Sequence, residues 1–357
     1  MPLPARKRPP SRRGSAKTKK AISAETTRES PVEEGPAAEL KSKPRPKSTK
    51  HRARSAPKRQ RPLRLRADTP LHKAAREMAA NAVALVTIGW HRVETEDGPE
   101  APHALRVALR RLRVVLHIFR DHIEDTPDAG LRASLAALGR QVGSLRDLDV
   151  LAHDIVGPVA TGSDVAGGTA LMALLEADRK QAISDVRQFL GSAESRALLD
   201  NLTTLATRLA TAVADSSDKR TLNKTAHRDI RKRWRKFAKQ AATIDKLDEA
   251  SLHEVRKSLK KLRYAFGYFT PCFGGNAAHH FDARLRRLQS TFGYLNDVAC
   301  AKQLEARLSS DAAQPDINCA IGFILGAHTE RAKSARDKLV EQYQKLADSK
   351  LARELGD

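Results

Sequence analysis

The sequence is poor in the residue types that build disulfide frameworks, zinc sites and membrane spans. Its three cysteines, Cys272, Cys300 and Cys319, are an odd number without C-x-x-C spacing, which argues against a disulfide framework and a zinc centre. It has no run of about 18 apolar residues, and its N-terminus lacks the apolar core of a signal peptide. We therefore expect a protein of the reducing cytoplasm that does not span a membrane.

Acidic residues are also scarce: 42 Asp and Glu stand against 65 Lys and Arg, a net charge of +23. Such an excess predicts a polyanionic partner, which could be nucleic acid, an anionic membrane or an inorganic polyanion. Residues 1–66 hold 21 of the basic and 5 of the acidic residues, a net of +16. This segment is rich in Pro and Ser and has no hydrophobic period, so we predict a disordered tail.

The rest of the chain, residues 67–351, repeats itself at an offset of 150 residues. The segment HALRVALRRLR at 103–113 matches HEVRKSLKKLR at 253–263, and GSLRDLD at 143–149 matches GYLNDVA at 293–299. Two segments that keep one offset indicate a duplication. We place the first repeat at about 71–214 and the second at about 221–351.

Apolar residues recur at three- and four-residue spacing in both repeats, which predicts helices and no strands. Gly- and Pro-containing breaks, such as 157–168 and 271–275, separate the segments. The sequence therefore predicts an all-α fold of two four-helix bundles related by a pseudo-twofold axis. The expected helices are 71–92, 101–122, 131–156, 169–190, a joining segment 194–214, and then 222–241, 251–271, 281–308 and 317–347.

Two of these helices carry a cationic stripe opposite an apolar one. At about 100° per residue, the stripe residues fall within roughly an 80° sector, and no Asp or Glu interrupts them. Arginine forks bind phosphate oxygens bidentately, so phosphate is the expected ligand class. The stripes are His103, Arg106, Arg110, Arg113 and His117 in the first repeat, and His253, Arg256, Lys260 and Arg263 in the second.

The duplicated His-x-x-Arg segments, each followed by Gly-x-Leu-x-Asp, resemble the CHAD domain, the conserved-histidine α-helical domain. This resemblance implies two four-helix bundles around a basic groove that binds inorganic polyphosphate. The Glu-x-Glu-x-Lys signature of the triphosphatase domain that accompanies many relatives is absent. The groove walls that the resemblance implies are His103, Arg106, Arg110, Arg111 and Arg113 on one side, and His253, Arg256, Lys260, Lys261 and Arg263 on the other.

Other candidates leave more than one interpretation open. His117 and the row formed by Arg228, Arg231 and Arg235 either widen the groove or belong to solvated helix faces. Asp147 and Asp297 are expected to pair with basic residues of a neighbouring helix, with metal binding as the alternative. The histidines lack a second ligand at i+3 or i+4, so we expect no metal, cofactor or catalytic residue.

The sequence thus predicts a cytoplasmic, non-enzymatic polyphosphate-binding protein associated with polyphosphate granules. One alternative is a nucleic-acid-binding protein that uses the basic tail without sequence specificity. Another is a phosphohydrolase acting on polyphosphate, which would need clustered carboxylates to hold Mg²⁺. The oligomeric state stays open.

Overall fold

A computed structural model describes residues 63–122, 129–163, 165–216, 220–308 and 315–356. All of them belong to one unit of contacts, Pro57–Asp357. The predicted disordered tail lies outside the described residues, apart from its last few positions. There Leu65 is 5% exposed and joins the hydrophobic core, so packed structure begins before the expected boundary at residue 67.

The described residues are helical and contain no β-strand, which confirms the all-α prediction. The first half of the chain contains α1 (Leu71–Thr95), α2 (Glu100–Ile118), η1 (Arg120–His122), α3 (Ala129–Val150), η2 (Leu151–Val156), α4 (Gly157–Ala160), α5 (Gly168–Gly191) and α6 (Ala193–Asp215). The second half contains α7 (Leu222–Ala241), α8 (Glu249–Phe273), α9 (Gly275–Leu308), α10 (Pro315–Ala347) and α11 (Lys350–Gly356).

Local chemistry explains where several helices begin and end. The side chains of Ser192, Thr221 and Asp248 accept hydrogen bonds from the first turns of α6, α7 and α8, as N-cap residues do. Gly274 and Gly275 have φ of 55° and 64°, a left-handed backbone that favours glycine and separates α8 from α9. The predicted break at 271–275 is therefore confirmed, although α8 continues past Pro271.

Three details depart from the sequence-based expectation. Residues 151–156 form a π-helix, η2, where a continuous α-helix was predicted. The predicted connection at 157–168 begins with one more helical turn, the short helix α4 from Gly157 to Ala160. The C-terminal helix α11 was not predicted, because its seven residues are too short to show a hydrophobic period.

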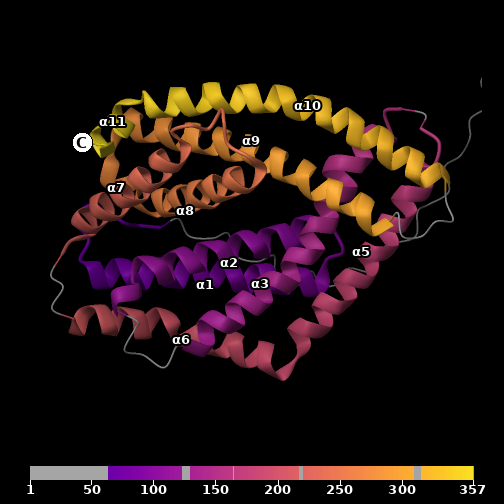
Figure 1. The fold of residues 1–357 in the computed structure, drawn as a ribbon. Coiled ribbons are helices and arrows are strands. Elements are labelled where there is room, and N and C mark those ends of the chain that lie inside the picture. Colours follow the sequence, from indigo (N-terminus) through magenta and orange to yellow (C-terminus); the bar gives the residue numbers. More distant parts are fainter. Residues whose placement is uncertain (1–62, 123–128, 164, 217–219, 309–314, 357) are drawn as a thin grey trace, which may run out of the picture. The chain divides into compact units, whose positions relative to one another are not determined.

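The packing order is the same in the two halves of the chain. Helix α2 packs between α1 and α3, α8 packs between α7 and α9, and α2 contacts α8. Helix α6 lies along α1, and the short α11 lies on α7 (Figure 1). One hydrophobic core draws residues from both halves, including Leu109, Leu138, Leu259 and Leu288. The internal repeat and its pseudo-twofold axis stay predictions.

A second, smaller core joins the two halves where α5, α9 and α10 meet η2 and α4. Buried polar contacts reinforce it. His328 of α10 is 2% exposed, and its two ring nitrogens lie 2.9 Å from the carbonyl oxygen of Ile155 and 2.9 Å from the hydroxyl of Tyr294. Nearby, Arg179 Nε donates to Asp149 Oδ1 at 2.8 Å. These contacts fix the far ends of α3 and α9 and so help to place the helix faces beside α2 and α8.

Candidate anion-binding site

Helices α2 and α8 bring their cationic stripes together where they contact each other. Their apolar sides are buried, with Leu109, Leu112 and Leu259 at most 1% exposed, so burial in the core turns the opposite sides outward. The charges of Arg106, Arg110 and Arg256 all act on Lys260. We call these four residues, Arg106, Arg110, Arg256 and Lys260, the central cationic cluster.

On the first wall, two arginines are held against α3. Arg106 Nη1 donates to the carbonyl oxygen of Gly143 at 2.7 Å and to Asp147 Oδ1 at 3.0 Å. Arg113 Nη2 donates to the carbonyl oxygen of Leu135. Both contacts depend on glycine, because a Cβ at Gly139 would collide with the guanidinium of Arg113 and one at Gly143 would lie 3.1 Å from Arg106 Nη1.

On the second wall, side chains take the place of these backbone contacts. Arg263 Nε donates to Gln289 Oε1, and Gln289 stands 150 residues after Gly139. Tyr264 connects the walls, because its hydroxyl accepts a hydrogen bond from Arg110 Nη1 at 3.1 Å. The guanidinium carbons of Arg263 and Arg110 lie 4.2 Å and 5.4 Å from the Tyr264 ring centroid, within cation–π range.

Two cations of the cluster have no such partner. Arg256 Nε is buried without a hydrogen bond, and within the described residues Lys260 makes neither a hydrogen bond nor an ion pair. Burial and the charges of Arg110 and Arg256 lower the pKa of Lys260 to about 6. Burial likewise lowers the pKa of Arg256. A positive charge that is partly buried without a partner is costly, and a bound anion would lower that cost.

The two predicted histidines lie at the ends of the cluster. Burial and the charge of Arg146 lower the pKa of His103, as expected for an imidazole among arginines. His253 Nδ1 lies 3.2 Å from Asn296 Oδ1 of the neighbouring helix α9. Both side chains are exposed, and each is free to turn one ring nitrogen toward a ligand.

The two repeated aspartates differ in their contacts. Asp147 forms the predicted ion pair with a neighbouring helix, to Arg106 at 3.0 Å. Asp297 makes no ion pair among the described residues. Burial raises its pKa, and the charge of Arg256 opposes that rise. Each aspartate therefore sits beside one arginine of the cluster.

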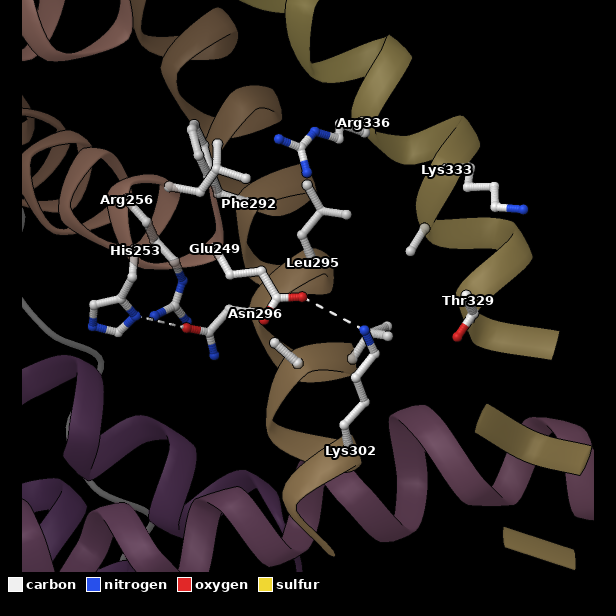
Figure 2. A pocket seen from close by; sticks show the side chains of 14 residues that line it. Glu249, His253, Arg256, Phe292, Leu295, Asn296, Lys302, Thr329, Lys333 and Arg336 are labelled. Carbon is white, nitrogen blue, oxygen red and sulfur yellow. Dashed lines mark hydrogen bonds and ion pairs between the residues drawn. The ribbon is translucent and has the colours of Figure 1, made fainter. Parts of the chain in front are cut away.

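A cavity of about 240 Å³ opens beside the cluster, between α8, α9 and α10 (Figure 2). His253 and Arg256 line it from α8, and its floor is apolar, formed in part by Phe292 and Leu295. The other cations of this cavity are engaged: Lys302 Nζ lies 3.5 Å from Glu249, Lys333 Nζ lies 2.8 Å from Glu330, and Arg336 donates to the carbonyl oxygen of Leu247. Among the described residues that line this cavity, Arg256 is the one whose side chain has a buried nitrogen, Nε, without a hydrogen-bond partner.

The structure does not bring all predicted site residues to the cluster. Arg111 lies near Tyr268, whose pKa it lowers against the larger effect of burial. Arg231 and Arg235 donate to the carbonyl oxygens of Glu354 and Gly356 at 3.5 Å and 3.0 Å, and so bind the end of α11. The remaining three, His117, Arg228 and Lys261, line a different cavity between the end of α2 and α7.

Sequence reasoning missed the residues that hold the cations in place. The sequence does not single out Tyr264, Gln289 or Gly139 as residues of the site. The alignment at offset 150 could have indicated one of these residues. Arg113 corresponds to Arg263, and Gly139, which lies against Arg113, corresponds to Gln289, which lies against Arg263. Asn296, one residue before the repeated aspartate, had no such indication.

Among the described residues, no group of three or more His, Cys, Asp or Glu side chains is placed to hold a metal ion. None of the described helices is long and apolar enough to cross a membrane.

Residues 69–306 match the family described as the CHAD domain. Two uncharacterised proteins from strains of Mycobacterium tuberculosis are each 23% identical over 285 residues, which is 78% of this chain and 53% of theirs. The chain therefore spans about half the length of these curated relatives.

Two solved structures resemble the fold. The crystal structure of the CHAD domain from the plant Ricinus communis has a TM-score of 0.69 and 24% identity, over 80% of this chain and 96% of that one. PptA from Streptomyces chartreusis has a TM-score of 0.55 and 19% identity, over 77% of this chain and 100% of that one. At these identities the resemblance bears on the fold alone.

Proposed function

This chain belongs to the CHAD family, which is associated with polyphosphate, and on that premise we propose that it binds inorganic polyphosphate at the central cationic cluster. The observation that carries the proposal is a pair of basic side chains, Arg256 and Lys260, close to the two held arginines. Among the described residues, Arg256 Nε and the amino group of Lys260 have no hydrogen-bond acceptor. A polyanion supplies the missing acceptors and restores the charge of the lysine.

The arrangement favours a chain of phosphates over a single ion. Arg106 and Arg113 are seven residues apart on α2, about 10 Å along the helix axis, and both guanidiniums are held by backbone carbonyls. Preorganised donors lose little entropy on binding. A flexible polyanion can follow both walls, with His103, Arg113, His253 and Arg263 extending the cluster at its ends.

A binding experiment with charge reversal tests this proposal. The full chain is titrated with long-chain polyphosphate and compared with Arg110→Glu and Lys260→Glu, each of which should weaken binding at least about tenfold, because charge-assisted hydrogen bonds contribute about 1.5–3 kcal/mol each. Lys239→Glu, an exposed residue of α7 outside the cluster, is the matched control and should change affinity little. Equal effects of all three charge reversals would mean that polyphosphate binds through general charge attraction and not at the central cationic cluster.

We further propose that binding occurs without turnover. Asp147 is paired with Arg106, and Asp297 lies close to Arg256 as well as to Asp154. Among the described residues no group of three or more His, Cys, Asp or Glu side chains is placed to hold a metal ion, a poor arrangement for the Mg²⁺ that phosphoryl transfer uses. Incubation with polyphosphate and Mg²⁺ should release no phosphate above background. Release that disappears in Asp297→Asn would establish the hydrolase alternative.

Nucleic acid is the second candidate ligand, and the observation that favours it is the net charge of +16 over residues 1–66. Such a segment binds any polyanion through counterion release, with a steep dependence on salt. Deletion of residues 1–56, which spares the buried Leu65, should remove most DNA binding and leave polyphosphate binding in place. We propose that the intact chain associates with polyphosphate granules, which microscopy of a tagged chain and of its Lys260→Glu variant would test.

A further inference from the structure

The second basic cavity lies apart from the central cluster, between the end of α2, η1, α7 and one face of α8. Its volume is about 390 Å³, which corresponds to roughly a dozen water molecules at about 30 Å³ each. That is room for a few tetrahedral phosphoryl groups. The basic residues that line it are His117, Arg120, Arg228, Lys232, Arg233, Lys236 and Lys261, with Asp121 and Asp229 as its carboxylates.

Both carboxylates of this cavity are already engaged. Asp121 pairs with Arg120 at 3.0 Å, and Asp229 accepts from Arg233 Nε at 2.5 Å. Within the part of the chain that the structure describes, the other four cations, Arg228, Lys232, Lys236 and Lys261, have no carboxylate partner. The cavity therefore keeps a strong positive charge that the protein itself does not neutralise.

One donor of this cavity is buried and unused. Arg233 is 9% exposed, and its Nη2 has no hydrogen-bond partner among the described residues, although its Nε is paired with Asp229. Leaving a charged donor buried and unpaired costs free energy. An anion in the cavity would accept from this group.

The fold does not require cations at these positions. Helices α1 and α7 bury the same pattern of positions at an offset of 151 residues, since they begin at Leu71 and Leu222. At that offset, the residues that correspond to Arg228, Lys232 and Lys236 are Glu77, Asn81 and Leu85. Arg228, Lys232 and Lys236 are exposed on α7. Within the described helices, the row of cations that lines this cavity is therefore particular to the second half.

We propose that this cavity is a second anion site, which binds a compact, multiply charged phosphate through Arg228, Lys232, Lys261 and the buried Nη2 of Arg233. Two sources share this chemistry: a free short phosphate such as pyrophosphate, and the end of a longer phosphate chain. The proposal does not depend on polyphosphate binding at the central cluster, because the two sites use different side chains.

The test is calorimetric titration of the full chain with pyrophosphate in a Lys260→Met background, which removes a cation of the central cluster and leaves the cavity intact. Binding should persist in that background. It should weaken at least about tenfold when Lys232→Gln and Lys261→Gln are added, since two charge-assisted contacts are lost. The matched control is Lys239→Gln, another exposed lysine of α7 that does not line the cavity, and it should leave affinity unchanged.

His117 gives a second readout at the site. Burial and the charge of Arg233 lower the pKa of its imidazole, so bound pyrophosphate should raise that pKa, which proton NMR of the ring can follow. No pyrophosphate binding, or equal loss in the cavity and control variants, would overturn the proposal. The same titration with long-chain polyphosphate then distinguishes the two sources of the phosphate. Weaker binding in the variant with Lys232→Gln and Lys261→Gln means that the end of a long chain enters the cavity. Unchanged binding means that the cavity takes the free short phosphate.

Discussion

Polyphosphate binding should be accompanied by uptake of about one proton at Lys260. With a pKa of about 6 in the free protein, only about 3 in 1000 of these side chains are charged at pH 8.5. Phosphates beside Nζ would return the pKa toward its ordinary value near 10.4. The lysine then binds a proton as the ligand binds, so affinity should fall by up to about tenfold per pH unit above pH 6.

Titration calorimetry at pH 8.5, in buffers of different ionisation enthalpy, measures this proton directly. At that pH the histidines contribute little, because their ordinary pKa lies near 6.5, and the arginines stay charged. In Lys260→Met the uptake should disappear, and its loss of affinity should be smaller at pH 8.5 than at pH 6. Uptake that is absent in the natural sequence, or equal in Lys260→Met, would refute the role given to this lysine.

Three further predictions concern the supports of the site, and urea denaturation followed by circular dichroism checks the first two. Gly139→Ala should lower the free energy of unfolding by about 1 kcal/mol, because loss of the Arg113 contact outweighs the better helix propensity of alanine. The control Gly267→Ala, at a glycine with open space around it, should instead raise the free energy of unfolding by about 1 kcal/mol. Equal effects of the two substitutions would contradict the contact between Gly139 and Arg113. Arg179→Met should cost about 3–5 kcal/mol at pH 7, because it leaves Asp149 buried and unpaired. That loss should shrink as the pH falls and Asp149 takes up a proton, since burial already raises its pKa; a loss independent of pH would argue against an orphaned charge. Tyr264→Phe should weaken polyphosphate binding by less than tenfold, since it removes only the hydroxyl that fixes Arg110, and a loss as large as that of Arg110→Glu in the same titration would mean that Tyr264 contacts the ligand itself.

Helix positions were predictable because a helix with one buried side has apolar residues at three- and four-residue spacing in its sequence. The expected segment 222–241 coincides with α7, and the segment 317–347 begins two residues after the start of α10. Glycine pairs and capping side chains also act locally, so the break at 271–275 was visible. The π-helix at 151–156 was not, because one extra residue in a helical turn barely changes the apolar period.

The site was predictable only as a set of residue types. The paired stripes placed Arg106, Arg110, Arg256 and Lys260 on the correct faces, since each face follows from the apolar residues opposite. Which basic side chains lack a hydrogen-bond acceptor depends on contacts between helices. A local sequence pattern does not show those contacts. The carbonyl oxygen of Gly143 accepts a hydrogen bond from Arg106, whereas among the described residues Arg256 Nε has no acceptor. Likewise Arg231 and Arg235 continue a basic row, yet they bind the end of a helix too short to be predicted.

A crystal structure of the full chain with bound polyphosphate tests the central claim most directly. The account predicts phosphate oxygens within hydrogen-bonding distance, about 2.7–3.2 Å, of Lys260 Nζ and Arg256 Nε, with the chain passing between α2 and α8. Phosphates bound elsewhere on the protein, with both of these nitrogens still without a phosphate acceptor, would contradict it.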